Sequence, residues 1–346
     1  MVEIDGARGE GGGQILRTSL ALAMITGRPL RMTKIRAGRA KPGLRRQHLA
    51  CVEAAAQLCH GEVRGATLSS QALELIPRAI TGGELTIDIG TAGSTTLVVQ
   101  TILVPALAAG LPLRAVITGG THNPLAPPFD FLDRVYAPHL RAMGADVTLT
   151  LDRHGFASGG GGRDRGGDQA HGQLTLTIGA GAALRPIEVV TAGPIVARRA
   201  TAILARLATH VGERELAVVQ DRLGFAASEC EVREVTAGGV ANVLLLEVER
   251  AEGRELVSAF GEKSVRAELI AQRACDELAA FLAADVPVGA HLADQLLLPL
   301  AVAGGGRFRA QPLSLHATTN IETIAQFLDV AIRVEPDGDS VIVTVG

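Results

Sequence analysis

Residues 10–46 read EGGGQILRTSLALAMITGRPLRMTKIRAGRAKPGLRR, and the order of elements that this stretch predicts recurs along the chain. Three glycines precede an apolar run, Gln14–Thr26, whose length and composition are typical of a buried helix that ends at Gly27. A short segment typical of a strand, Leu30–Ile35, follows, and then the basic loop Arg36–Arg46. The stretch therefore predicts a helix, a strand and a loop in that order.

The same order recurs twice further along the chain. The second copy comprises the helix Ser94–Ala109, Gly110, the strand Leu113–Ile117 and the loop Gly119–Pro128. The third copy comprises the helix Leu292–Ala303, glycines 304–306, the strand Phe308–Leu315 and the loop His316–Asn320. Further helices are expected after the three loops, over Leu44–His60, Asp130–Met143 and Ile321–Leu328. We therefore predict an α/β (α+β) fold of three repeated strand/helix units, whose equivalent loops can converge on one site.

A region of different composition interrupts this repeat. Arg153–Gly172 contains runs of glycine and charge that are typical of a long polar loop. From about 184 to 278 strands and helices follow in another order, including a helix expected over Pro194–His210 with the proline in its first turn. We predict a main domain over 1–183 and 279–346 and a small inserted α/β domain over 184–278.

The composition excludes several function classes. The chain has 346 residues, 47% of them apolar, and a formal net charge of −3, so it can bury a large core and is no strongly basic nucleic-acid coat. Aromatic residues make up 3%, too few for a module that stacks bases. The most apolar stretch, Leu97–Ala109, is too short and too interrupted to span a bilayer. Four cysteines without a CxxC pair predict reduced thiols, so we expect a soluble cytoplasmic enzyme.

Two segments indicate phosphate chemistry. In Glu10–Arg17, glycines before a helix expose backbone N–H groups that favour an anion, and Glu10 would suit a divalent cation beside it. The alternative is a plain glycine-rich turn. Arg36–His48 concentrates positive charge in an acidic chain, which suits a clamp for polyphosphate or a nucleic-acid backbone. The alternative there is a solvated basic face.

Three later features fit either a structural or a binding role. Ser94, after Gly93, suits both a helix cap and an anion site. Gln100 is a polar amide on an otherwise apolar helix, where a buried amide needs a partner. The proline-rich loop around His122 suits a ligand wall or a rigid structural loop.

The third helix and the loop after it carry the remaining candidates. Asp294 lies near the expected start of that helix and suits an N-cap as well as a ligand contact. His316 lies at the equivalent loop of the third unit. From the residues alone, His316 cannot be ranked above His48 or His122.

Six blocks of the sequence, taken in order, resemble the RNA 3′-terminal phosphate cyclase family. The blocks are EGGGQILR at 10–17, RAGRAKPGLRRQHL at 36–49, GTAGSTTLVVQT at 90–101, GGTHNPLAPPFDFL at 119–132, HLADQLLLPLA at 291–301 and the His-x-x-Thr-Asn of 316–320. The resemblance runs from about Ile4 to the end of the sequence.

This resemblance implies a fold, a reaction and partners. The fold would consist of three repeats that resemble the C-terminal domain of a translation initiation factor, with a smaller inserted domain. The reaction would use ATP and a divalent metal, Mg²⁺ or Mn²⁺, to convert an RNA 3′-phosphate end into a 2′,3′-cyclic phosphodiester. A histidine would attack the α-phosphate of ATP, release pyrophosphate and carry AMP to the RNA 3′-phosphate, from which the ribose 2′-OH would expel it. A homodimer is left open, and no membrane association is expected.

The resemblance also assigns roles to individual residues. His316 aligns with the nucleophile, and neutral imidazole suits this role because it is a good nucleophile at cellular pH. Glu10 would lie at the metal. The phosphate and RNA contacts would come from Arg17, Arg36, Arg39 and Gln47, and the ATP contacts from Gln100, Pro127, His291, Leu292, Ala293, Asp294 and Gln295. His291 replaces an aromatic residue that is often found there, and it would sandwich the adenine with Pro127.

Three other interpretations compete with an active cyclase. The non-catalytic branch of the family acts in ribosomal RNA maturation and lacks the nucleophilic histidine and much of the phosphate clamp, whereas both are present here. An adenylating enzyme that acts mainly on other ends, such as 5′-phosphates, would use the same residues, and the sequence does not separate it from a cyclase. A carboxyvinyl transferase of the related repeat architecture would need neither a covalent histidine nor an adenine site, so the six blocks disfavour it.

Overall fold

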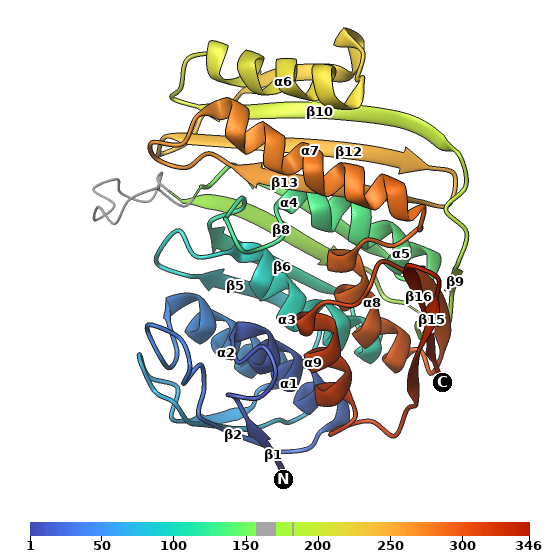
Figure 1. Cartoon of the computed structure of the whole chain (residues 1–346). Coiled ribbons are helices and arrows are strands. Elements are labelled where there is room, and N and C mark those ends of the chain that lie inside the picture. Colours follow the sequence, from blue (N-terminus) through green and yellow to red (C-terminus); the bar gives the residue numbers. More distant parts are fainter. Residues whose placement is uncertain (157–170, 182) are drawn as a thin grey trace.

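The described chain forms four sheets of four strands each, with helices packed on them (Figure 1). This computed structural model describes residues 1–156, 171–181 and 183–346. Most of the predicted polar loop over 153–172 lies outside the described residues. The mixed α/β class that the sequence predicts is confirmed.

Three of the sheets share one topology. In each, a first strand pairs in parallel with a second, the second pairs antiparallel with the fourth, and the fourth pairs antiparallel with the third. The strands of the first sheet are, in spatial order, β1 (Val2–Asp5), β2 (Leu30–Thr33), β4 (Leu73–Ile76) and β3 (Glu62–Arg64). Those of the second are β5 (Gly83–Asp88), β6 (Leu113–Gly119), β8 (Gly172–Ile178) and β7 (Val147–Arg153). Those of the third are β9 (Glu188–Val189), β14 (Gly306–Ala310), β16 (Ser340–Val345) and β15 (Ile332–Asp337).

Each of these sheets has two helical segments at matching points of the chain. The segment between the first two strands is α1 (Gly13–Thr26), α3 (Thr95–Ala109) or α8 (Ala290–Val302). The segment after the second strand is α2 (Arg46–Cys59), the run α4 (Phe129–Phe131), η1 (Leu132–Tyr136) and α5 (Ala137–Ala142), or α9 (Leu315–Ile324). The apolar runs of α1, α3 and α8 are almost entirely buried, which explains why hydrophobic helices sit at the centre of the molecule.

The fourth sheet interrupts the third unit. Its strands are β11 (Cys230–Glu234), β10 (Ile195–Ala205), β12 (Ala241–Arg250) and β13 (Gly253–Phe260), and the helices of this region are α6 (His210–Leu223), η3 (Ala227–Glu229) and α7 (Ala267–Ala284). The chain enters this region after β9 and leaves it to form α8, and Figure 1 shows it at the top of the molecule. One face of the sheet packs on α6 and α7 around Leu244 and Leu246, and the other face contributes Val243 and Leu245 to the main core. Strand β9 of the third sheet lies inside the predicted insert of 184–278, and α7 runs across its predicted end at 278. The domain division stays a prediction.

Two local predictions were wrong. The helix expected over Pro194–His210 is instead the strand β10, because its residues pair along almost their full length with β12, a partner more than 35 residues away that local spacing does not reveal. The loop expected at His316–Asn320 is the start of helix α9. Ser314 caps that helix, because its hydroxyl accepts a hydrogen bond from the Ala317 N–H at 3.3 Å. His316 therefore lies in the first turn of a helix.

Within the described part of the chain, no helix is both long and apolar enough to cross a membrane.

Candidate functional site

A cavity forms where the first helices of the three units meet. Helix α1 packs on α3 and α9, and α8 packs on α3 and α9. The residues that line the cavity are Gln14, Arg17 and Thr18 of α1, Gln100 and Val104 of α3, Tyr136 of η1, Asp294, Gln295 and Leu298 of α8, and Asn320 of α9. Four residues that the sequence analysis singled out, Arg17, Gln100, Asp294 and Gln295, thus face one space.

His316 lies at the edge of this group. Its ring nitrogen Nδ1 is 2.6 Å from Oε1 of Gln14, and its Nε2 is 4.0 Å from Oε1 of Glu10. The side chain is 53% exposed, so a substrate can reach it. Partial burial lowers the pKa of His316 and Arg17 lowers it further, whereas Asp294 opposes them. The ring is therefore neutral near pH 7.

The carboxylate of Asp294 accepts hydrogen bonds from two side-chain amides. Nε2 of Gln14 donates to its Oδ1, and Nδ2 of Asn320 donates to the same oxygen at 3.1 Å and to the Asp294 carbonyl at 3.0 Å. Burial raises the pKa of this carboxyl group, and His316 and Arg17 counteract that rise. A side-chain network therefore joins α1, α8 and α9, from His316 through Gln14 to Asp294 and Asn320.

Glu10 and Arg39 form a second group beside His316. The Arg39 guanidinium is paired with Oε1 of Glu10, and its Nη2 also donates to the Glu10 carbonyl at 3.1 Å. The Glu10 N–H donates to Oγ1 of Thr319 at 3.0 Å, which ties the glycine-rich loop to α9. Oε2 of Glu10 is buried without a hydrogen-bond partner among the residues that the structure describes. A Cβ atom at Gly12 would collide with this carboxylate, so the loop needs glycine there.

Arg17 and His48 both approach Gly13, the first residue of α1. An added Cβ at Gly13 would lie 2.7 Å from Nε2 of His48 and 3.0 Å from Nη1 of Arg17, so both side chains approach the same backbone. Nδ1 of His48 accepts a hydrogen bond from the Arg45 N–H at 3.0 Å. Burial, assisted by nearby arginines, lowers the pKa of His48 to about 3, so this ring is neutral. The arrangement places an uncharged histidine beside a partly buried guanidinium, where it does not compete for an anion.

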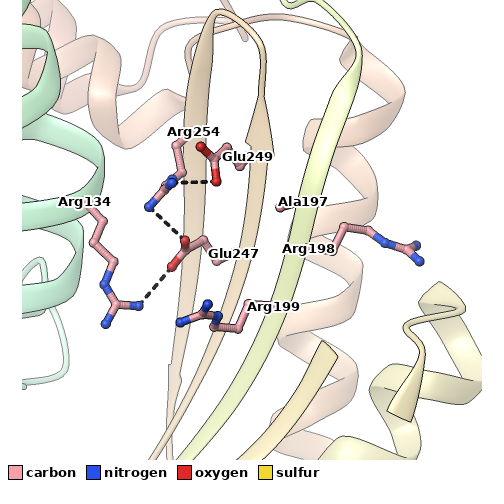
Figure 2. Close-up of a pocket in the computed structure, with 7 residues that line it drawn as sticks. All are labelled: Arg134, Ala197, Arg198, Arg199, Glu247, Glu249 and Arg254. Atoms are coloured by element: carbon pink, nitrogen blue, oxygen red, sulfur yellow. Dashed lines mark hydrogen bonds and ion pairs between the residues drawn. The ribbon is translucent and has the colours of Figure 1, made fainter. Parts of the chain in front are cut away.

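A second cavity lies between η1 and the inserted sheet (Figure 2). Its residues are Arg134, Ala197, Arg198, Arg199, Glu247, Glu249 and Arg254. Glu247 accepts from Arg134 and Arg254, each at 3.0 Å, and Arg199 lies directly across from it in the pairing of β10 with β12. The charged groups of this cavity therefore largely pair with one another, and the pair of Arg134 with Glu247 links η1 to the inserted sheet.

The loop around His122 connects to the second cavity through Asp130 and Arg134. His122 is 1% exposed, and its Nε2 is 2.8 Å from Oδ2 of Asp130. Asp130 in turn pairs with Arg134 at 2.9 Å, and Nδ2 of Asn123 donates to the Ala92 carbonyl at 2.6 Å. These buried contacts favour the structural role that the sequence analysis left open for His122.

Comparison with known proteins shows the family of this chain. The family model described as "RNA 3'-terminal phosphate cyclase" matches residues 8–334. The chain belongs to the RNA 3′-terminal phosphate cyclase family. It is 48% identical over 332 residues to the RNA 3′-terminal phosphate cyclase of Ectopseudomonas mendocina, covering 96% of this chain and 94% of that protein. It is 46% identical over 343 residues to that of Pseudomonas fluorescens, covering 99% and 96%, and 42% identical over 338 residues to that of Koribacter versatilis, covering 97% and 92%. The protein is thus an enzyme of this family.

The phosphate residues that the cyclase family implies lie in different settings. Arg36 turns back on its own loop, where Nη1 donates to the carbonyls of Lys41 and Gly43, each at 2.8 Å. Gln47 lies at the start of α2, close to Gly93 in the loop before α3. Arg39 is the partly exposed partner of Glu10. The structure thus explains how Arg36 braces the basic loop, and its predicted contact with phosphate stays a prediction.

The adenine contacts implied by the cyclase family are also spread out. The side chain of His291 is 74% exposed and lies 3.6 Å from Oε1 of Glu277, whose hydrogen bond raises the pKa of the ring. The carbonyl of Pro127 accepts from the Thr96 hydroxyl at 2.8 Å. The side chains of Leu292 and Ala293 are fully buried, so any contact of theirs with a nucleotide would use the backbone. The sandwich of adenine between His291 and Pro127 stays a prediction.

Two residues of the network around His316 and Asp294 had no role in the predictions from sequence. Gln14 and Asn320 lie within the blocks EGGGQILR and His-x-x-Thr-Asn, yet neither received a role. Gln14 is 6% exposed and Asn320 also 6%, and both bond to the partly buried Asp294. A nearly buried amide that follows a glycine run at a helix start is the signal that would have found Gln14.

Proposed function

We propose that this protein uses ATP to convert the 3′-phosphate end of an RNA into a 2′,3′-cyclic phosphodiester, through AMP carried covalently on His316. The observation that supports this most directly is the state of His316. Its ring is neutral, one nitrogen is engaged by Gln14, and the other faces Glu10 and Arg39 at an accessible edge. A neutral imidazole with a free nitrogen is the form that can attack phosphorus.

The reaction would proceed in three steps. Nε2 of His316 attacks the α-phosphorus of ATP, a P–N bond forms, and the bond from that phosphorus to the pyrophosphate oxygen breaks. An oxygen of the RNA 3′-phosphate then displaces the histidine, which leaves the RNA end joined to AMP. Finally the neighbouring ribose 2′-OH loses its proton, attacks the 3′-phosphorus and releases AMP. The covalent intermediate divides one difficult reaction into easier displacements.

Cationic side chains near His316 would bind the phosphates. Arg39 is half-exposed beside His316, and Arg17 lines the cavity beyond it. Guanidinium groups bind phosphate through paired hydrogen bonds and stabilise the charge that develops during phosphoryl transfer. We propose Arg17, Arg36, Arg39 and Gln47 as the phosphate and RNA contacts. Gln100, Pro127 and His291–Gln295 are proposed as the ATP contacts.

Glu10 is the residue that suits a divalent metal, Mg²⁺ or Mn²⁺. Its Oε2 is buried and unpaired among the described residues, and an orphaned carboxylate oxygen fits a cation. The described part of the chain contains no cluster of three or more metal-binding side chains. This agrees with a metal held by one carboxylate together with phosphates of the substrate, which is a common mode for Mg²⁺. When bound, the metal would neutralise phosphate charge.

Several sequence predictions stay proposals beside this one. They are the likeness of the three units to the C-terminal domain of a translation initiation factor, the inserted domain over 184–278, a cytoplasmic location and a homodimer.

The test is to incubate the protein with ATP labelled at the α-phosphate and a divalent metal, without RNA, and to run a denaturing gel. We expect acid-labile label on the wild type and on His210→Ala, a matched change at an exposed histidine of α6, and none on His316→Ala. Addition of RNA with a 3′-phosphate should then remove the label and form cyclic ends. Absence of label at all metals and pH values would favour the non-catalytic branch of the family. Label that passes only to 5′-phosphate ends would favour the other acceptor.

A further inference from the structure

The side-chain amide of Gln14 lies between His316 and the carboxylate of Asp294. Its Oε1 is 2.6 Å from Nδ1 of His316, and its Nε2 donates to Oδ1 of Asp294. Asn320 donates to the same oxygen of Asp294 at 3.1 Å. The three helices α1, α8 and α9 thus each contribute one member or more to a single chain of hydrogen bonds.

The chemistry of this chain fixes the direction of every bond in it. An ionised carboxylate only accepts hydrogen bonds, so the Gln14 atom that faces Asp294 must be the NH₂ group. The carbonyl oxygen of Gln14 must then face His316, and a carbonyl oxygen also only accepts. Nδ1 of His316 must therefore carry the proton. With the proton on Nδ1, Nε2 is the ring nitrogen that can present a lone pair to an electrophile.

The geometry leads us to propose that Gln14 and Asp294 are positioning residues that hold His316 in the tautomer with the proton on Nδ1 and a free lone pair on Nε2. This inference rests on the proposed function, in which Nε2 of His316 attacks ATP. Neither Gln14 nor Asp294 needs to touch the reacting phosphorus for this role. Asn320 holds the Asp294 carboxylate in place from the other side.

The amide between ring and carboxylate has a chemical advantage over direct contact. A carboxylate bonded directly to the ring would favour the imidazolium form and place a proton on Nε2. The amide instead transmits part of the negative potential of Asp294 and keeps the ring neutral. When the P–N bond forms, the ring gains positive charge while Nδ1 keeps its proton, and the oriented Gln14 carbonyl stabilises that charge. The charged ring is then a good leaving group when AMP moves on.

The first measurement is the ¹⁵N spectrum of the full-length protein labelled at its histidines, which distinguishes a protonated from a bare ring nitrogen. His316 is assigned by the signals lost in His316→Ala. We expect the wild type to have its proton on Nδ1, whereas Gln14→Met and Asp294→Asn should contain a substantial share of the other tautomer. Gln326→Met, the same change at an exposed glutamine after α9, should match the wild type. A wild-type proton on Nε2, or identical His316 signals in Gln14→Met, would overturn the proposal.

The second measurement is the rate of single-turnover labelling by ATP that carries label at the α-phosphate. Gln14→Met and Asp294→Asn should each lower the rate about tenfold to hundredfold, the effect of one or two lost hydrogen bonds. For Gln14→Met, the ATP concentration that gives half the maximal rate should change little. The decisive variant is the double change Gln14→Glu with Asp294→Asn. It preserves the total charge and keeps an acceptor facing Nδ1 of His316, whereas the bond between positions 14 and 294 is reversed, because the new carboxylate accepts from both neighbours.

The double variant distinguishes positioning from mere packing. At a pH high enough to keep the ring neutral, it should label faster than either single variant, because an acceptor again faces Nδ1 of His316. A double variant as slow as the slower single variant would show that the network only supports the fold. If His316→Ala still accepts label, the proposed function fails, and the tautomer measurement still reports on the network by itself.

Discussion

Replacing Glu247 by glutamine should weaken the junction between the inserted sheet and η1. Glu247 is 8% exposed and accepts hydrogen bonds from two guanidinium groups, those of Arg134 and Arg254, each at 3.0 Å (Figure 2). Each arginine keeps a second carboxylate after the change. Arg134 retains Asp130 at 2.9 Å, and Arg254 retains Glu249 at 2.6 Å. The substitution therefore removes one negative charge and two ionic hydrogen bonds with almost no change in volume.

The size of the effect follows from the burial of these groups. A hydrogen bond to a charged group contributes about 1.5–3 kcal/mol to stability. The two arginine side chains are 25% and 26% exposed, so water replaces part of what each loses. We expect Glu247→Gln to lower the free energy of unfolding by about 2–3 kcal/mol, less than the sum of two fully buried bonds. Glu249→Gln is the matched control, because Glu249 is 40% exposed and has one partner, and it should cost no more than about 1 kcal/mol.

Urea unfolding at pH 7, followed by circular dichroism, would measure both variants under one condition. The inserted sheet contributes Val243 and Leu245 to the main core, so loosening the junction should also expose β12 to hydrogen exchange. Equal losses for the two variants, within about 0.5 kcal/mol, would refute the reasoning, since they would show that a doubly paired buried carboxylate stabilises no more than an exposed one.

Three further outcomes are expected. Gly13→Ala should slow adenylation at least about tenfold while the helix content is kept, because the new methyl group would displace His48 and Arg17 from the start of α1, and an unchanged rate would contradict this. Burial raises the pKa of Glu215 to about 7, so the neutral carboxyl group stabilises the fold at low pH. This stabilisation is lost as the pH rises through 7. Glu215→Gln should therefore be more stable than the wild type at pH 8, by up to about 3 kcal/mol, and no more stable at pH 4.5. Arg39→Ala should impair cyclisation and change the unfolding free energy by less than about 1 kcal/mol, since the Arg39 side chain is 45% exposed, and the opposite pattern would indicate a structural residue.

The sequence predicted well what depends on local pattern. The apolar runs with glycine at their ends located α1 and α3 to within a residue or two, because glycine at the C-cap of each adopts a positive φ, +66° at Gly27 and +65° at Gly110. The prediction failed at β10, whose arginines and alanines are compatible with a helix. Pairing with β12 decides that segment, and a strand partner distant in sequence leaves no mark on local spacing.

The site was predicted in the same uneven way. Arg17, Gln100, Asp294 and Gln295 were singled out and face one cavity. The bond from Gln14 to Asp294 joins residues 280 positions apart, so no spacing rule could have found it. For Arg36 the sequence predicts a phosphate contact, and it gave no sign that Nη1 donates to two backbone carbonyls of the same loop.

The repeated topology itself explains why the cavity is polar at the centre of an apolar molecule. Thr18, Gln100 and Gln295 are each the sixth residue of the first helix of their unit, in α1, α3 and α8, and all three line the cavity. Equivalent positions of three similarly placed helices thus meet at one point, as the equivalent ends of repeated units should. One residue earlier, two of the helices carry opposite charges, Arg17 and Asp294, and the third carries an apolar residue. A polar residue at the same position of each apolar helix can therefore be read from the sequence without any relative. In the proposed function, the differences one position away distinguish the unit that would bind anions from the unit that would orient the histidine.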